Sequence, residues 1–133
     1  MKKGRTVLQA KRYGIHSCGP TTSLISAIRT MVEDEVSSLV VLSNEGYLMG
    51  LVTRADILRA HLDLDDWASR QVQEFMAREV PVVSPTTLLI EAARMMMDQP
   101  VRQVVVALDE GEHKRPVAIL TIGDLAYHLV KAG

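Results

Sequence analysis

An internal repeat limits the folds open to this chain more than any other feature of its sequence. When the sequence is shifted by 65 residues, 13 of the 27 positions in 20–46 carry the same residue as their counterparts in 85–111. Ordinary composition would give roughly two such matches by chance. Beyond Gly46 the offset becomes 68, because the second copy carries extra residues around 112–115. The chain is therefore expected to build the same small unit twice.

Each copy is predicted to run strand, helix, strand, strand, helix. A short extended segment that stops at a proline opens each copy, and apolar residues at helical spacing follow. Two valine-rich strands separated by turn residues indicate a hairpin, and a helix closes the copy. The predicted strands are 15–18, 36–42 and 48–52, then 80–83, 101–108 and 117–120; the closing helices are 55–61 and 124–130; the apolar stripes are Leu24, Ile25, Ile28, Met31 and Val32, then Leu89, Ile90, Ala93, Met96 and Met97.

One copy of about 60 residues is too small to bury a sufficient core alone. The two copies are therefore predicted to pack against each other around a pseudo-twofold axis. The fold class that follows is α+β, with two βαββα repeats. The predicted boundaries are a first repeat with its leader at 1–62, a linker at 63–70 and a second repeat at 71–133.

The segments that flank the repeats are also assigned from the pattern. A helix through Val72, Phe75 and Met76 is expected to pack on the second copy. The segment before Ile15 is expected to pack on the first copy, because Val7 aligns with Val72. The basic residues of that leader are interpreted as a solvated surface; they are Lys2, Lys3, Arg5, Lys11 and Arg12.

Composition excludes several classes of function. With 47% apolar and 23% charged residues, the chain is not a disordered tail. No apolar run approaches the roughly 20 residues of a membrane span, and no secretory signal is visible. The net charge of −1 disfavours a dedicated nucleic-acid binder. A single cysteine, Cys18, indicates a reducing compartment, so a cytoplasmic protein is expected.

Residues 50–56, Gly-Leu-Val-Thr-Arg-Ala-Asp, resemble the ligand-binding signature of cystathionine beta-synthase (CBS) domains. Residues 118–124 match this signature at Thr121 and Asp124, but Ala118 replaces its first glycine. The added methyl group is expected where backbone approaches a ligand. One short signature is weakly specific. Two of them, each after the same run of elements, resemble a tandem CBS pair, or Bateman module, over nearly the whole chain.

The Thr-x-x-Asp pattern has two physical interpretations, and both stay open here. A threonine at the start of a helix and a carboxylate three residues on form a cap that stabilises by about 1 kcal/mol without any ligand. Alternatively, the unpaired N–H groups of the helix N-terminus suit a phosphate, and the carboxylate can accept hydrogen bonds from vicinal ribose hydroxyls. A cap in the empty protein can become a ligand contact, so the two are compatible.

The resemblance implies a role for each site position. The threonines are expected toward phosphate, the aspartates toward ribose, and residues of the first strand of each copy toward adenine. Arg54 is interpreted either as a phosphate contact or as an exposed residue at the start of a helix. The implied ligand-binding residues are Thr53, Asp56, Thr121, Asp124, Arg54, Ile15, His16, Cys18, Val80 and Val82.

An enzyme built on His16 and Cys18 is a third class of hypothesis, because residues two apart on a strand face the same side. No further His or Cys stands at metal-ligand spacing, so no metal site is predicted. No Walker sequence is present, so phosphoryl transfer is not indicated. Cys18 is interpreted as a small core residue facing the cleft. The sequence is therefore expected to encode no enzyme and to use no cofactor.

The leading hypothesis is a stand-alone regulatory or sensor module. It would bind an adenosine-containing ligand (AMP, ADP, ATP or S-adenosylmethionine) in the cleft between its repeats, and a partner would read the resulting population shift. CBS pairs associate through their helices, so the resemblance implies a homodimer and an effector protein that the sequence does not identify. The alternative is a structural module for dimerisation or partner docking with empty clefts. No membrane or nucleic-acid partner is expected.

Overall fold

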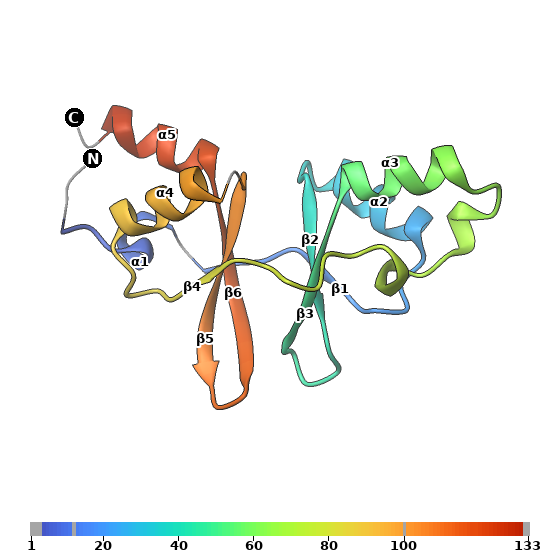
Figure 1. Ribbon diagram of the computed structural model, residues 1–133, viewed down its shortest axis with the longest axis horizontal. Helices are drawn as coiled ribbons and strands as arrows, with labels where there is room; N and C mark the ends of the chain where they lie inside the picture. Colours follow the sequence, from blue (N-terminus) through green and yellow to red (C-terminus); the bar gives the residue numbers. More distant parts are fainter. Residues whose placement is uncertain (1–3, 12, 100, 132–133) are drawn as a thin grey trace. The chain divides into compact units, whose positions relative to one another are not determined.

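The computed structural model describes residues 4–11, 13–99 and 101–131, which form two compact units. His16–Val80 makes the first-copy unit, whereas the second-copy unit joins the N-terminal segment through Ile15 to the chain from Pro81 onward. Each unit holds one three-stranded sheet and its own helices (Figure 1). The predicted α+β class, with one architecture built twice, is confirmed.

The first-copy unit is built on a sheet with strand order β1-β2-β3. β1 pairs in parallel with β2, and β2 pairs antiparallel with β3. The middle strand is buried almost throughout, so it reads as an unbroken apolar run rather than an alternating one. Its elements are β1 (Ser17–Cys18), α2 (Leu24–Glu33), β2 (Ser38–Leu42), β3 (Leu48–Thr53), α3 (Arg54–Asp63) and the 3₁₀ turns η1 (Trp67–Ser69) and η2 (Val72–Glu74).

The second-copy unit repeats this order as β4-β5-β6, again with one parallel and one antiparallel pairing. A short helix, α1, precedes it in the sequence and contributes the buried side chain of Val7. The elements are α1 (Val7–Ala10), β4 (Val82–Val83), α4 (Leu89–Asp98), β5 (Gln103–Glu110), β6 (His113–Thr121) and α5 (Ile122–Lys131). Within the described residues, no helix combines the length and apolar character needed to cross a bilayer.

The apolar stripes of α2 and α4 are narrower than the sequence pattern predicts. Leu24, Ala27 and Met31 are buried on α2, and the equivalent Leu89, Ala92 and Met96 are buried on α4. Val32 and Met97, expected at the edge of the stripes, are 60% and 63% exposed, so that part of the prediction is wrong. The reason is geometric, since positions i, i+3 and i+7 face the sheet and the next position has turned toward solvent.

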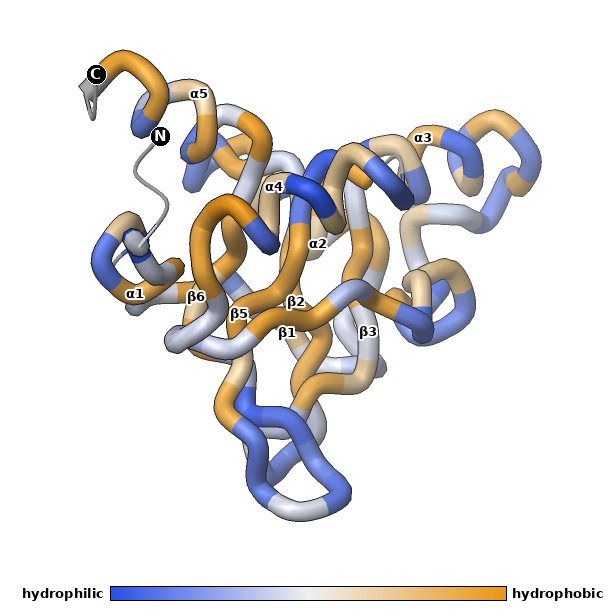
Figure 2. Tube along the Cα trace, turned by 60° about the vertical axis from the view of Figure 1, so that its left-hand side comes forward, coloured by the Kyte–Doolittle hydropathy of each residue, from blue (hydrophilic) through white to orange (hydrophobic). Residues whose placement is uncertain are grey.

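The second-copy hairpin is longer than the first because the extra residues extend β6. Gly46 and Gly111 supply the positive φ angles, 86° and 70°, at the two turns. Lys114 pairs with Asp109 and Arg115 with Glu110 across the longer hairpin. Figure 2 shows the apolar central strands in orange and the hydrophilic end of this hairpin in blue. The basic residues of the insertion thus pair within the hairpin itself.

The prediction for the flanking segments is wrong, because each packs on the opposite copy. Val7 lies in the core of the second-copy unit, whereas Val72 and Met76 lie in the core of the first-copy unit. Backbone hydrogen bonds fix both placements: the Val7 N–H donates to the Thr87 carbonyl at 2.9 Å, and the Val72 N–H donates to the Thr22 carbonyl at 2.9 Å. The alignment of Val7 with Val72 indicates equivalent positions in the two copies, but it does not show which copy each segment would join.

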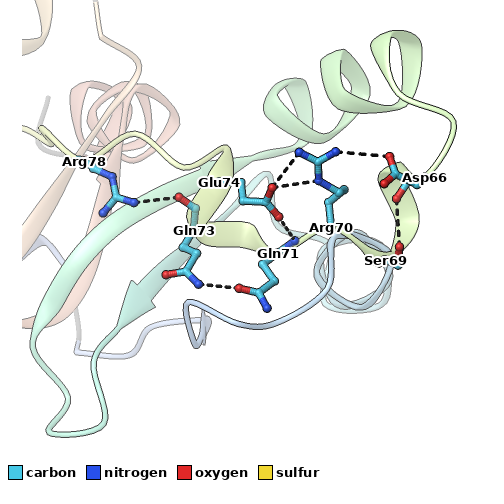
Figure 3. Close-up of polar contacts among 7 residues, drawn as sticks. All are labelled: Asp66, Ser69, Arg70, Gln71, Gln73, Glu74 and Arg78. Atoms are coloured by element: carbon cyan, nitrogen blue, oxygen red, sulfur yellow. Dashed lines mark hydrogen bonds and ion pairs between the residues drawn. The ribbon is translucent and has the colours of Figure 1, made fainter.

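The region predicted as a helix through Val72, Phe75 and Met76 contains the single turns η1 and η2 instead. Arg70 holds this stretch together by pairing with Glu74 at 2.8 Å and with Asp66 at 3.4 Å (Figure 3). The hydrogen bond from Arg70, followed by that from the Gln71 N–H, lowers the pKa of the Glu74 carboxyl. The same hydrogen bond to Glu74 raises the pKa of the Arg70 guanidinium. The segment between α3 and β4 therefore forms two separate 3₁₀ turns with local ion pairs, and not one helix.

Candidate functional site

The first candidate site lies where β3 ends and α3 begins. Thr53 is the last residue of the strand and the N-cap of the helix, with extended backbone angles (φ −115°, ψ 164°). Its hydroxyl accepts a hydrogen bond from the Asp56 N–H at 3.2 Å, and the Asp56 carboxylate accepts one from the Thr53 N–H at 2.9 Å. This reciprocal pair is a capping box. The second oxygen of Asp56 accepts a hydrogen bond from Arg59.

The second-copy unit repeats this arrangement where β6 meets α5. The Thr121 N–H donates to Asp124 Oδ2 at 2.8 Å, and the Asp124 N–H donates to the Thr121 hydroxyl at 3.1 Å. The hydroxyl also donates to Asp124 Oδ2 at 3.1 Å. Here a residue distant in the sequence also contacts the aspartate: Lys11 Nζ lies 3.1 Å from Asp124 Oδ1 and 3.0 Å from Oδ2. The capping interpretation of the motif is therefore realised at both junctions.

Arg54 has a structural role at the first junction. Its Nε donates to the Val36 carbonyl at 3.0 Å and its guanidinium to the Met31 carbonyl at 3.0 Å. Met31 lies in the last turn of α2, where carbonyls have no partner within the helix. The arginine therefore caps α2, and a phosphate contact would require it to leave both carbonyls.

The glycine of the first signature serves the packing of the chain on itself. A Cβ at Gly50 would lie 2.6 Å from the Ala77 carbonyl oxygen and 2.8 Å from Met76 Sδ. The neighbouring Leu51 exchanges two backbone hydrogen bonds with Ala77. This explains the glycine without a ligand, contrary to the expectation that a ligand's approach requires it.

The equivalent strand of the second-copy unit carries Ala118, and here the glycine stands on the facing segment. Gly14 forms a bridge with Ala118, and its N–H donates to the Val117 carbonyl at 2.7 Å. Its φ of 149° favours glycine. A Cβ at Gly14 would meet no atom within 4 Å, so its backbone angle, and not a close approach, accounts for this glycine. Ala118 is buried beside this bridge, so the second-copy unit accommodates the methyl group that Gly50 could not carry.

The first-strand residues fall in different units. His16 and Cys18 belong to the first-copy unit together with Val80, whereas Ile15 and Val82 belong to the second-copy unit. The His16 carbonyl accepts from the Val40 N–H at 3.0 Å, which is part of the parallel pairing of β1 with β2. All except His16 are partly buried.

The geometry argues against an activated nucleophile at Cys18. Burial raises the pKa of its thiol to about 11, although a hydrogen bond with Thr22 acts in the opposite direction. At neutral pH the thiol is therefore protonated, whereas a nucleophilic cysteine needs a depressed pKa. The imidazole of His16 lies 3.2 Å from the Asp34 carboxylate, with which it can form a hydrogen bond. Among the described residues, no group of three or more His, Cys, Asp or Glu side chains is arranged to hold a metal.

Sequence reasoning missed three residues that shape these sites. Arg59 follows Asp56 by three residues, a spacing from which its contact was predictable. Lys11 and His128 are different, because each contacts a residue more than 100 positions away: Lys11 pairs with Asp124, and His128 Nε2 lies 2.7 Å from the Ala10 carbonyl oxygen. No sequence spacing reveals such contacts. Lys11 was predicted to belong to a solvated basic surface, and that part of the prediction is wrong because the residue is partly buried in an ion pair. The leader residues Lys2, Lys3 and Arg12 lie outside the described residues.

Two βαββα units, each with a capped Thr-x-x-Asp at a strand-to-helix junction, define the architecture of a paired CBS module. A family model for the CBS domain matches the chain twice, over residues 11–63 and 72–131. The chain belongs to the CBS domain family. Proteins with such pairs are generally regulatory rather than catalytic.

Individual relatives share this architecture over nearly the whole chain. A crystal structure of CBSX2 in complex with AMP has a TM-score of 0.83 and 26% identity, and the match covers 97% of this chain and 98% of that one. The structure of an uncharacterized conserved protein from Pyrococcus horikoshii has a TM-score of 0.82 and 27% identity, covering 97% and 95%. An uncharacterized 17.7 kDa protein of Acidianus ambivalens is 26% identical over 93% of this chain and 73% of its own length.

Proposed function

We propose that this protein is a regulatory module that binds an adenosine-containing ligand at its Thr-x-x-Asp junctions. The observation that carries the proposal is the recurrence of the same hydrogen-bonded Thr–Asp pair at both strand-to-helix junctions. Similarity to CBSX2, whose structure contains AMP, supports an adenine nucleotide as the ligand class.

The first-copy unit has the chemistry for ribose and phosphate. Asp56 Oδ2 accepts a hydrogen bond from the Thr53 N–H and Oδ1 accepts one from Arg59, so both oxygens keep acceptor capacity for vicinal hydroxyls. The adjacent N-terminus of α3, a ten-residue helix, carries a partial positive charge that favours a phosphate. The Arg54 N–H already donates to the Ser37 carbonyl and the Asp56 N–H to the Thr53 hydroxyl, so the proposal relies on this charge and not on a row of free N–H groups. In this proposal the edge of β1 near His16 and Cys18 contacts adenine, and binding shifts the population of states that a partner protein recognises.

Calorimetric titration with adenosine, AMP, ADP, ATP and S-adenosylmethionine tests the proposal. We expect micromolar binding of at least one ligand, and a loss of about tenfold or more at the first-copy site in Asp56→Asn, because one or two hydrogen bonds to a charged acceptor are removed. Asparagine keeps one oxygen for the Thr53 N–H, so the cap survives while the second acceptor is lost.

Asp63→Asn is the matched control, since Asp63 is an exposed carboxylate at the opposite end of the same helix. Its affinity for every ligand is expected to equal that of the unmodified protein. If neither heat nor a thermal shift is seen with any ligand at millimolar concentration, the protein is no adenosine sensor.

A second candidate function is dimerisation through the helices, and the exposed apolar side chains favour it. Leu62 near the end of α3 is 80% exposed, and Val130 near the end of α5 is 79% exposed. Leu58, Ile122 and Leu129 add further exposed apolar surface to the same two helices. Because the capping boxes are complete without a ligand, such a structural role does not require an occupied site. We propose a second copy of this chain as the partner.

Light scattering tests the dimer. At micromolar concentration the unmodified protein is expected to have twice the mass of one chain. The double variant Leu62→Glu/Val130→Glu is expected to be a monomer with an unchanged circular dichroism spectrum, because charges in an apolar interface lose their hydration. Gln99→Glu places the same charge at an exposed polar position and should remain dimeric. A monomeric unmodified protein would rule the dimer out.

A further inference from the structure

We propose that Lys11 competes with the ligand for Asp124, so that its ion pair hinders ligand binding at the second-copy site. The first-copy site is not hindered in this way. We call the ion pair of Lys11 with Asp124 the latch. This inference rests on the proposed function, because it concerns how ribose hydroxyls gain access to the same carboxylate. It assigns different affinities to two sites whose motifs are nearly identical. The argument comes from the partners of the two aspartates.

The contact of Lys11 with Asp124 is bidentate and partly shielded from water. Its ammonium lies 3.1 Å from one carboxylate oxygen and 3.0 Å from the other. The side chains of Lys11 and Asp124 are only 30% and 25% exposed. An ion pair in this setting is less screened than one on the open surface.

Lys11 is held in place by the segment that carries it. The Ala10 carbonyl oxygen is 2.7 Å from Nε2 of His128, which is itself buried. Asp124 and His128 are four residues apart on α5 and therefore lie on one face of the helix. The Lys11 N–H donates to the carbonyl of the fully buried Val7 at 2.8 Å. Two polar contacts from one helix face thus anchor consecutive residues, Ala10 and Lys11.

Acceptor capacity distinguishes the two aspartates. A carboxylate offers about four acceptor sites. These sites are about two on each oxygen, and on Asp124 they are used unevenly. Oδ2 receives the Thr121 N–H, the Thr121 hydroxyl and the ammonium and is therefore saturated, whereas Oδ1 receives the ammonium alone. Asp56 accepts one hydrogen bond on each oxygen, and its partner Arg59 has a side chain that is 67% exposed. A ribose can therefore join either oxygen of Asp56 directly, whereas at Asp124 it can join only Oδ1, where it competes with Lys11.

Two consequences follow from this difference. The first-copy site binds the ligand more tightly than the second-copy site, even though both carry Thr-x-x-Asp. Occupation of the second-copy site also frees Lys11 and so weakens one of the two anchors of the N-terminal segment. Ligand binding is thereby coupled to that segment, which supplies a physical signal that a partner can read.

Adenosine is the probe that tests the latch, because it has the ribose hydroxyls but no phosphate. With a phosphate-bearing ligand, removal of the Lys11 charge would also weaken the attraction to the phosphate and would obscure the effect at the ribose. In an Asp56→Asn background, which isolates the second-copy site, Lys11→Met is expected to raise the affinity for adenosine on the order of fivefold, since the competing ion pair is removed. Lys11→Gln, which also lacks the charge, should raise the affinity for adenosine as well. This second variant keeps the test valid if Lys11→Met fails to fold.

The matched control is Arg59→Met in an Asp124→Asn background, which removes the equivalent but more exposed partner of Asp56. We expect less than a twofold change there. Unchanged or weaker adenosine binding in both Lys11 variants would overturn the latch.

If the unmodified protein binds adenosine but no variant binds it in the Asp56→Asn background, the latch is wrong and the proposed function survives at the first-copy site. If the unmodified protein does not bind adenosine, AMP or the other ligands, the proposed function fails and the latch fails with it.

Discussion

Replacing Gly50 by alanine is expected to lower the free energy of unfolding by about 1–3 kcal/mol, the cost of forcing an extra methyl group into a packed interior. The new Cβ would lie 2.6 Å from the backbone oxygen of Ala77 and 2.8 Å from the sulfur of Met76. The methionine can move, but the carbonyl is tied by the hydrogen bond that it accepts from the Leu51 N–H at 3.0 Å. Relief of the clash must therefore displace the strand edge. Chemical denaturation followed by circular dichroism measures the loss.

Gly123→Ala provides the control for Gly50→Ala. Its Cβ would meet only the Thr121 hydroxyl oxygen at 3.5 Å, an ordinary contact, and the residue lies in the first turn of α5. Alanine is preferred to glycine in a helix by up to about 1 kcal/mol, so this variant should be as stable as the unmodified protein or slightly more stable. Equal stability of Gly50→Ala and the unmodified protein would show that the close approach at Ala77 does not constrain the fold.

Met96→Ala is expected to lower the free energy of unfolding by about 2–5 kcal/mol, whereas Met97→Ala should change it by less than about 0.5 kcal/mol. The two residues are chemically identical neighbours on α4, but Met96 is fully buried and Met97 is 63% exposed. Truncation at Met96 leaves a cavity against Leu89, Ala92 and the buried strands of the second-copy unit. Truncation at Met97 removes atoms that face water.

Parallel denaturation curves of the two methionine variants measure this difference. The same test applies to the first copy, where Met31 is buried and the following Val32 is 60% exposed. A loss at Met97 comparable to that at Met96 would mean that this face of α4 is covered by other atoms in solution. Equal and small losses at both positions would contradict the core that the structure describes.

Much of the fold was predictable from the sequence because its determinants are local or repeated. The repeat predicted two copies of one unit, and the hairpins, strands and amphipathic helices follow from spacing within short windows. The predicted first and last residues of the strands were less accurate. The strand predicted at 15–18 is confined to Ser17–Cys18, and the one predicted at 117–120 extends over His113–Thr121, because strand length depends on the available pairing partner rather than on composition.

The local contacts of the candidate site were predictable from the sequence, but its long-range contacts were not. The Thr53–Asp56 and Thr121–Asp124 contacts span three residues each, so the first turn of a helix brings them together wherever the rest of the chain lies. The anchoring of Arg54 on the end of α2 was not predictable, because it depends on how α2 and β3 pack. Neither was the pairing of Lys11 with Asp124.

The repeated unit follows from the similarity of two stretches of the sequence, and the two capped junctions follow from residues three positions apart. Contacts between distant parts of the chain set the rest: which core receives Val7 and which receives Val72, why residue 50 must be glycine, and which cation meets each aspartate. The physical reason is that the two copies carry nearly equivalent surfaces. The equivalent positions of Val7 and Val72 therefore do not indicate which core each joins, and the path of the folded chain distinguishes them.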